Sequence, residues 1–380
     1  MALNQPQRIA IVHEWFTSMR GGEKCVEALC ELFPQAEIYS LVHVKGSVSP
    51  TIERMSGHTS FIQKLPFAEK QYRHYLPLFP TAIQRFDLTG FDLVITSNHC
   101  VAKGVCVPPT ALHVCYCYTP MRYIWGLYDE YFSKDRAGLL TRAGMRLFVN
   151  YLRRWDVRTA GNPHHFIAIS RHVQQRISTI YHRAADVIYP PVDTSFYQPS
   201  SHSDDGSFLI VSAFVPYKRV DLAIEAFNML GARLVIVGDG PDAARLRAMA
   251  RSNIEFAGWQ PNEKLREYYG RCRALIFPGE EDFGIVPVEA MASGKPVIAF
   301  AAGGALETVI DSPGLRTGIL FKEQTVDSLV RAVREFQGQE FSPDVLRAFA
   351  LGFDRDVFKH RIKEYLESKW AEFRAHPPKR

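Results

Sequence analysis

Short apolar runs alternate with longer helical segments along this chain, and the alternation starts a second time near its middle. The runs expected to form buried strands are residues 8–13, 92–97, 112–118 and 166–170, and then 208–214, 233–240, 254–258, 274–279 and 296–300. Such an alternation predicts parallel α/β layers, with helices covering both faces of each sheet. Because 380 residues are too many for one core, we expect two α/β domains.

The segment 187–207 marks the boundary between the two domains. Its two adjacent prolines and the Ser/His/Asp/Gly cluster that follows cannot continue a helix or a central strand. The sequence therefore predicts one domain over residues 1–190 and another over residues 191–356. The last segment, 357–373, has an apolar stripe among alternating charges, which predicts an amphipathic helix packed on the body of the protein.

Composition and cysteine usage favour a cytoplasmic protein. No window reaches the roughly 18 uncharged apolar residues of a membrane span, and the first residues lack the basic and apolar regions of a signal peptide. The seven cysteines are odd in number and contain no Cys-x-x-Cys pair. We therefore expect reduced, mostly buried thiols rather than disulfides or a zinc site.

The net charge of +5 is unevenly spread along the chain. Residues 1–190 hold 21 Lys and Arg against 14 Asp and Glu, and the remainder holds 24 against 26. The basic first half favours an anionic partner there, such as a phosphate-bearing acceptor or an anionic membrane surface. Ordinary solvated charge explains the excess equally well. The basic residues form no recognisable nucleic-acid-binding module, so no nucleic acid partner is expected.

The segment 279–300 carries two carboxylates, Glu281 and Glu289, on either side of Gly284. A helix is expected to begin near Ile285, and its unpaired N–H groups would suit a phosphate or a sugar hydroxyl. Gly284 lets the backbone approach a ligand closely. Glu281 is placed to accept hydrogen bonds from a sugar, and Glu289 from the vicinal hydroxyls of a ribose. Taken alone, the segment also fits a solvated acidic run before an ordinary buried helix.

This spacing resembles the Glu-seven-Glu motif of the retaining GT-B glycosyltransferases of family four, the glycosyl transferases group 1. Further segments resemble other motifs of that family, namely residues 13–29, 211–227, 235–246, 254–259 and 301–309. The resemblance implies two Rossmann-like domains whose parallel sheets face each other across a cleft. It also implies that a C-terminal helix, at about residues 357–375, packs back on the N-terminal, acceptor-binding domain.

Carried over residue by residue, the resemblance implies that Lys218 pairs with the diphosphate of a nucleotide-sugar donor. Gly21 and Gly22 would bring N–H groups to the distal phosphate. The base would be read largely by backbone around Gly258. The complete set of expected donor-binding residues is Gly21, Gly22, Lys218, Arg219, Gly258, Glu281, Phe283, Gly284, Ile285 and Glu289.

The chain departs from the family pattern at two positions. Ala213 stands where the family carries an arginine, so one diphosphate-binding cation is missing, and Arg219 is the candidate replacement. Tyr118 stands where the family carries an active-site histidine; a tyrosine can donate a hydrogen bond, but its ordinary pKa of about 10 makes it a poor base. His99, at another strand end, is the better histidine candidate, although a purely structural role suits it equally. The expected catalytic residues are thus Glu281, Lys218, His99 and Tyr118.

The aromatic segment 121–132 is expected to form the acceptor side, with Arg122, Tyr123 and Trp125 as acceptor-binding residues, because flat aromatic faces stack on sugars. The arginine-rich segment 133–158 that follows would suit anionic headgroups beside a polyprenyl-diphosphate-linked acceptor. A core helix with a solvated arginine face is the alternative. The expected partners are therefore a glycan or lipid-linked acceptor and a peripheral contact with the inner face of the cell membrane.

Residues 119–125 and 189–193 resemble the mannosyltransferases that build bacterial polysaccharides, such as exopolysaccharide, O-antigen or capsule. That resemblance favours GDP-mannose as donor, with a UDP-sugar as the alternative. We expect no cofactor and no metal. The chain's one Asp-x-Asp triplet, residues 354–356, lies far from the donor motifs and is more simply a helix-start cap.

Other functions fit less well. A nicotinamide dehydrogenase needs Gly-x-Gly-x-x-Gly after its first strand, whereas residues 21–26 are GGEKCV. A GT-B phosphorylase would need a lysine-bound pyridoxal phosphate, and a nucleotide-sugar epimerase would act on the donor alone. A nucleotide-sugar-binding protein that has lost catalysis remains an alternative, which the departures at Ala213 and Tyr118 permit.

Overall fold

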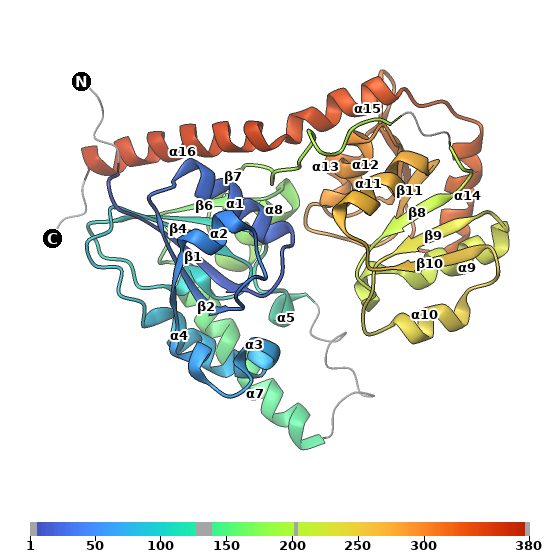
Figure 1. The fold of residues 1–380 in the computed structure, drawn as a ribbon. Helices are drawn as coiled ribbons and strands as arrows, with labels where there is room; N and C mark the ends of the chain where they lie inside the picture. Colours follow the sequence, from blue (N-terminus) through green and yellow to red (C-terminus); the bar gives the residue numbers. More distant parts are fainter. Residues whose placement is uncertain (1–5, 127–138, 201–203, 377–380) are drawn as a thin grey trace. The chain divides into compact units, whose positions relative to one another are not determined.

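The computed structural model describes residues 6–126, 139–200 and 204–376, without the side chains of residues 123 and 139–147. Contacts divide the chain into two units (Figure 1). The first unit comprises the residues up to Pro191 together with those from Phe358 onward, and the second comprises Val192–Val357.

The first unit is built on a seven-stranded, entirely parallel sheet in the order β3-β2-β1-β4-β5-β6-β7. Its strands are β1 (Ile9–Phe16), β2 (Glu37–His43), β3 (Ser56–Thr59), β4 (Leu93–Asn98), β5 (Leu112–Cys117), β6 (His165–Ala168) and β7 (Asp186–Val187). Strand β1 is buried along its whole length, as expected for a central strand covered on both faces. The chain order reverses between β1 and β4, which is where doubly wound sheets place ligands.

Helices of the first unit connect these strands. They are α1 (Gly21–Leu32), α2 (Pro50–Met55), α3 (Ala68–Gln71), α4 (Phe79–Gln84), α5 (Arg122–Trp125), α7 (Leu139–Thr159) and α8 (Arg171–Tyr181). The core joins strand residues such as Val12 and Val94 to Leu152 and Trp155 of α7.

The second unit repeats the plan with a six-stranded parallel sheet in the order β10-β9-β8-β11-β12-β15. Its strands are β8 (Phe208–Val211), β9 (Leu234–Val237), β10 (Ile254–Gly258), β11 (Ala274–Phe277), β12 (Val297–Phe300) and β15 (Gly318–Phe321), and β13 (Asp311–Ser312) and β14 (Leu315–Arg316) form a separate antiparallel pair. The helices are α9 (Val220–Leu230), α10 (Ala243–Met249), α11 (Asn262–Arg271), α12 (Ile285–Ala292), α13 (Ala305–Thr308), α14 (Val326–Gln337) and α15 (Pro343–Ala350). Here the chain order reverses between β8 and β11.

The terminal helix α16 (Arg355–Ala375) packs on the first unit. The Phe358 ring lies 5.6 Å from that of Tyr116, and the Tyr365 hydroxyl donates to Asp186 at 3.0 Å. Its buried residues, spaced four apart, are Phe358, Ile362, Leu366 and Trp370, which confirms the predicted amphipathic helix. An Asp354 carboxylate oxygen accepts the Asp356 N–H at 2.8 Å, so the acidic triplet caps a helix, as expected.

All the apolar runs that predicted strands lie on strands of the two sheets, and the predicted two-domain α/β class is confirmed. Strands β2, β3, β7, β13, β14 and β15 were not predicted. The seven cysteines are free, and all but Cys106 are buried, which confirms that they are mostly buried. In the part of the chain that the structure describes, no helix is long and apolar enough to cross a membrane.

Shortening the buried Leu366 to alanine should destabilise the first unit. Leu366→Ala removes packed methyl groups from the buried face of α16 and should lower the free energy of unfolding by about 3 kcal/mol. We expect faster amide exchange in β5 and β6 and unchanged exchange in β8 and β11. The exposed neighbour Glu367→Ala serves as control. Equal acceleration in both sheets would show that α16 does not belong to the first unit alone.

Candidate functional site

In the second unit, Lys218 and Glu281 meet where the chain order of the sheet reverses. Lys218 ends the short 3-10 helix Pro216–Lys218 after β8, and Glu281 follows β11. A Cβ atom on Gly279 would lie 2.9 Å from the Lys218 Cα, so the two loops touch backbone to backbone. The Lys218 ammonium forms an ion pair with the Glu281 carboxylate. Their side chains are 16% and 21% exposed, which leaves the pair within reach of a ligand.

Two glycines hold the Glu281 loop in place. The Gly304 N–H donates to the Glu281 carbonyl oxygen at 2.8 Å. A Cβ atom on Gly303 would lie 2.3 Å from the same oxygen, and one on Gly304 would lie 2.3 Å from the Phe283 Cα. Neither position has room for a side chain, and Gly303 has a φ of +61° that favours glycine. The Gly-Gly loop after β12 therefore fixes the backbone that carries Glu281.

Helix α12 begins at Ile285, which confirms the predicted helix start. Gly284 precedes it with φ +89° and no side-chain cap. Pro287 has no N–H, so the N–H groups of Ile285 and Val286 are the donors at this helix end. Together with Lys218 they form the kind of positive end that binds phosphate groups.

Glu289 lies one turn further along α12 and is 4% exposed. Its carboxylate accepts a hydrogen bond from the Tyr269 hydroxyl of α11 at 3.0 Å. Burial raises the pKa of Tyr269 well above its usual value, so the phenol stays protonated as the donor. Glu289 thus lies within the first turns of α12 and forms a buried pair with Tyr269 that the sequence did not reveal.

Two of the remaining donor-binding candidates, Arg219 and Phe283, have side chains that are engaged within the second unit. Arg219 lies 3.3 Å from Asp221 and donates to Gln324 at 3.1 Å. These contacts hold its guanidinium at Asp221 and Gln324. The Phe283 ring is 3% exposed and packs 5.7 Å from that of Phe353, so its side chain belongs to the core.

Gly258 ends β10 with φ +71°, and its carbonyl oxygen accepts the Gly238 N–H at 2.8 Å. Trp259, the next residue, is 74% exposed. The predicted base-side loop therefore offers both backbone groups and an aromatic face at the end of the sheet.

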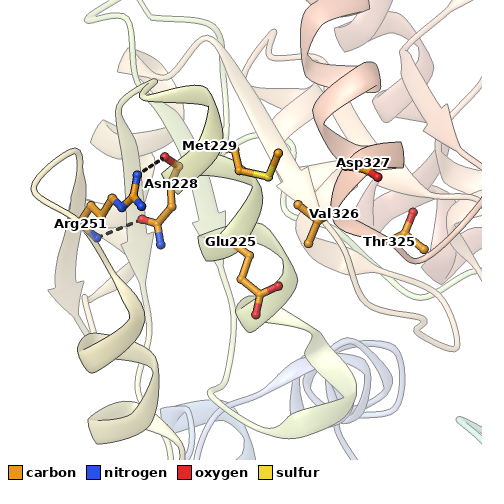
Figure 2. A pocket seen from close by; sticks show the side chains of 7 residues that line it. All are labelled: Glu225, Asn228, Met229, Arg251, Thr325, Val326 and Asp327. Carbon is orange, nitrogen blue, oxygen red and sulfur yellow. Dashed lines mark hydrogen bonds between the residues drawn. The ribbon is translucent and has the colours of Figure 1, made fainter.

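A cavity of about 460 Å³ in the second unit is a separate feature (Figure 2). It is lined by Glu225, Asn228, Met229, Arg251, Thr325, Val326 and Asp327. The Arg251 guanidinium donates to the Asn228 carbonyl oxygen at 3.2 Å, and the Arg251 backbone N–H donates to the Asn228 side-chain oxygen at 3.0 Å. None of the expected donor-binding residues lines this cavity, so we do not place the donor there.

In the first unit, a chain of hydrogen bonds links β1, β4 and the end of β5. The Tyr118 hydroxyl donates to the Gly22 carbonyl oxygen at 3.0 Å, because a carbonyl can only accept. It therefore accepts the Ser97 hydroxyl proton at 2.8 Å. Ser97 in turn accepts from His13 Nδ1 at 2.9 Å. The bond to the carbonyl thus sets the direction of the whole chain.

These hydrogen bonds give Tyr118 a positioning role at the turn formed by Gly21 and Gly22. Its ring would lie 3.6 Å from a Cβ atom on Gly22, at the start of α1 beside Gly21. Burial raises the pKa of Tyr118 well above its usual value. A phenol that donates to a backbone carbonyl and resists ionisation is suited to holding the turn, and it is not suited to accepting a proton.

His99 is held by a fully buried carboxylate, Glu14. One Glu14 oxygen accepts backbone N–H groups at 2.8–3.1 Å from four successive residues, His99, Cys100, Val101 and Ala102. The other oxygen lies 2.9 Å from His99 Nδ1. Burial alone would raise the pKa of Glu14, but the charge and hydrogen bond of His99 lower it to about 2. Burial alone would lower the pKa of His99, but the charge of Glu14 raises it. The buried Glu14 carboxylate therefore favours the protonated form of His99.

Of the acceptor candidates, Arg122 and Trp125 lie on α5. The Trp125 indole N–H donates to the buried Asp156 carboxylate at 2.7 Å. The Tyr123 side chain, residues 127–138 and the side chains of residues 139–147 lie outside the described residues. Much of the arginine-rich segment expected to face a membrane is among them.

Several side chains of these clusters were not predicted from the sequence, among them Glu14, Ser97 and Asp156. The signal for Asp156 was present as a lone acid in the basic run RRWDVR. Within residues 6–126, 139–200 and 204–376, no three His, Cys, Asp or Glu side chains cluster in a way that could hold a metal ion.

Part of the second unit matches a known protein family. The family model for glycosyl transferases group 1 matches residues 193–347. A GDP-mannose-dependent alpha-(1-6)-phosphatidylinositol monomannoside mannosyltransferase of Mycobacterium tuberculosis is 29% identical over 198 residues, or 44% of this chain and 51% of that protein. A GDP-mannose-dependent alpha-mannosyltransferase of the same species is 34% identical over 162 residues, or 38% of this chain and 42% of that protein. The chain spans about half the length of the curated relatives it matches.

The whole chain also resembles solved structures. That of HepE from Anabaena in complex with UDP superposes with a TM-score of 0.69 at 18% identity, covering 95% of this chain and all of that one. At this identity the likeness concerns the fold, and it confirms the predicted GT-B class with two Rossmann-like units.

Replacing Glu14 by glutamine should remove a pH-dependent stabilisation of the first unit. The lowered Glu14 pKa contributes stability above its ordinary 4.5, which is lost as the pH falls toward about 2. The raised His99 pKa contributes stability below its ordinary 6.5, which is lost as the pH rises through the folded value. Glu14→Gln should therefore cost most between these two values, on the order of 3 kcal/mol.

Urea unfolding at pH 3, 5.5 and 9 measures this difference, with the exposed Glu69→Gln as control. Proton NMR should show His99 titrating at lower pH in the Glu14→Gln variant. A pH-independent loss of stability and an unchanged His99 titration would contradict the ion pair.

Proposed function

We propose that this chain, whose residues 193–347 match the family model for glycosyl transferases group 1, transfers a sugar from a nucleotide-sugar donor to a glycan or lipid-linked acceptor. The observation that carries the proposal is the Lys218–Glu281 ion pair beside the first N–H groups of α12. One partner suits a diphosphate and the other suits sugar hydroxyls, and both lie where doubly wound sheets bind nucleotides.

The donor would enter by separating this ion pair. The diphosphate replaces Glu281 as the partner of Lys218, and the sugar hydroxyls replace Lys218 as the partners of Glu281. The N–H groups of Ile285 and Val286 then face the same anion. Each charge released from the apo pair thus gains a new partner in the complex.

Transfer would proceed with retention, on the donor's own face. The bond between the sugar's anomeric carbon and the diphosphate breaks, and a bond to the acceptor oxygen forms. The acceptor proton passes to the departing diphosphate, so no side-chain base is required. Lys218 and the helix N–H groups stabilise the charge that develops on the leaving group. This route suits a chain in which Tyr118 donates to Gly22 and His99 is paired with the buried Glu14.

GDP-mannose is the donor we propose, because both mycobacterial relatives are named as GDP-mannose-dependent. A UDP-sugar is the second candidate, favoured by the UDP bound in HepE. Exopolysaccharide, O-antigen or capsule synthesis is the proposed setting. The expected contact of the arginine-rich segment with an anionic membrane surface belongs to the same proposal.

Substituting Glu281 and Lys218 in turn should have different effects on GDP affinity and on the transfer rate. Glu281→Gln removes the anion that competes for Lys218, so GDP affinity should hold or rise, while transfer falls by about 100-fold or more. Lys218→Met should weaken both GDP binding and transfer. Isothermal titration with GDP and a radiolabelled transfer assay measure the two effects.

The exposed Lys322→Met, in the same unit, is the matched control and should behave as wild type. Weaker GDP binding by Glu281→Gln than by Lys218→Met would contradict the assigned roles. GDP binding by the wild type without transfer to any acceptor would favour a binding protein that has lost catalysis.

We also propose that transfer needs no divalent metal, since Lys218 and the α12 N–H groups take the place of a cation at the diphosphate. Treatment with EDTA should leave the transfer rate unchanged. A loss of activity that Mn²⁺ restores would refute this.

A further inference from the structure

A cavity of about 340 Å³ lies in the first unit, apart from the polar cluster at His99. Its lining comes from the end of α5 and from one helix, α8, and consists of Trp125, Gly126, His172, Gln175, Arg176, Thr179 and Ile180. The α8 residues are spaced three and four apart, so they share one face of the helix. One wall is thus aromatic, and the other carries four polar side chains and Ile180.

The aromatic wall is held rigidly. The Trp125 indole N–H donates to Asp156 at 2.7 Å. Arg153 lies over the same ring, with its guanidinium carbon 5.3 Å from the ring centroid, and donates to the Ile124 carbonyl oxygen at 2.8 Å. The ring's polar atom is therefore engaged inside the protein, and what Trp125 offers the cavity is apolar surface.

The same buried carboxylate holds the polar wall. The Tyr181 hydroxyl, at the end of α8, donates to Asp156 at 2.9 Å. The Lys103 ammonium lies 2.5 Å from the other Asp156 oxygen, and both side chains are fully buried. Asp156 thus joins α5 and α8 through one satisfied charge. The cavity is set before any ligand arrives, which lowers the entropy cost of binding.

We propose that this cavity binds a pyranose ring of the acceptor glycan, stacked on Trp125, with its hydroxyls at Gln175, Arg176 and His172. A pyranose has an apolar C–H face and a rim of hydroxyls that both donate and accept. An aromatic wall facing a row of amide, guanidinium and imidazole groups complements that shape. That the cavity binds a sugar follows from its lining alone. That this sugar belongs to the acceptor rests on the proposed transferase function.

The cavity volume falls within the usual range for small-ligand sites. Arg176 and His172 would also suit a phosphate group. A phosphate, however, makes no use of an aromatic wall whose single polar atom is turned into the protein. The observations therefore favour a neutral sugar, and an anion becomes an outcome of the test.

Titration of the full ¹⁵N-labelled chain with neutral disaccharides tests the proposal. The probes are mannobiose, cellobiose and lactose, with inorganic phosphate as a separate arm. The Trp125 indole cross-peak, assigned by Trp125→Phe, should move on addition of at least one disaccharide. The cross-peak of the exposed Trp259, in the second unit, should not move. No movement of the Trp125 peak with any disaccharide, or movement with phosphate alone, would overturn the proposal.

Substitutions of Trp125 and Gln175 then test whether each wall of the cavity contributes to disaccharide binding. Trp125→Ala and Gln175→Ala should each weaken disaccharide binding by about tenfold or more, and Trp125→Phe should restore part of it. Gln175 is exposed, so Gln175→Ala carries little risk to folding, and the exposed Ser178→Ala on the same helix is the matched control. Unchanged binding by Gln175→Ala would contradict the assigned site.

GDP binding should be the same in all these variants, because Lys218 and Glu281 belong to the second unit. Failure of the transferase proposal would appear as absent transfer while the disaccharide titration persists. Failure of the present inference would appear as absent disaccharide binding while transfer persists.

Discussion

The close contact between the Gly303–Gly304 backbone and the loop of Glu281 and Phe283 is the constraint on which the second unit's site depends. No side chain fits between these loops, so the end of β12 supports the end of β11 directly. Gly279 allows the same approach to the Lys218 loop. The result is that a carboxylate and an ammonium group are brought together at the entrance of α12. Without these glycines, bulky side chains would separate the loops and the charges they carry.

The two units use one architectural rule for different chemistry. In each sheet the order of strands reverses once, and the charged residues gather at the carboxyl ends on either side of that reversal. The second unit gathers a lysine, a carboxylate and helix N–H groups. The first unit gathers buried Glu14, His99 and a series of hydrogen bonds that ends on Gly22. Because the carboxylate raises the pKa of His99, this histidine suits the binding of an anionic or polar group better than it suits base catalysis.

Much of the fold was predictable from sequence because buried parallel strands are continuous apolar runs that end in small or polar residues. Strand β2 was missed because EIYSLVH mixes polar and apolar residues, and β15 because GILF begins at a glycine, a residue that is depleted in strands. The Glu281–Lys218 neighbourhood was predictable from the resemblance of both segments to the glycosyl transferases group 1. The bonds from Glu14 to residues 99–102 were not, because they join segments about 85 positions apart, and local pattern carries no record of such pairing. Phe283 was expected at the donor, but the structure turns its ring into the core.

If a sugar diphosphate displaces the Lys218–Glu281 contact, a crystal structure of the chain with GDP-mannose bound will show it. We expect a diphosphate oxygen within hydrogen-bonding distance of Lys218 Nζ and of the Ile285 N–H, with the Glu281 carboxylate at the hexose hydroxyls. A nucleotide bound elsewhere, with the Lys218–Glu281 pair still closed, would contradict it.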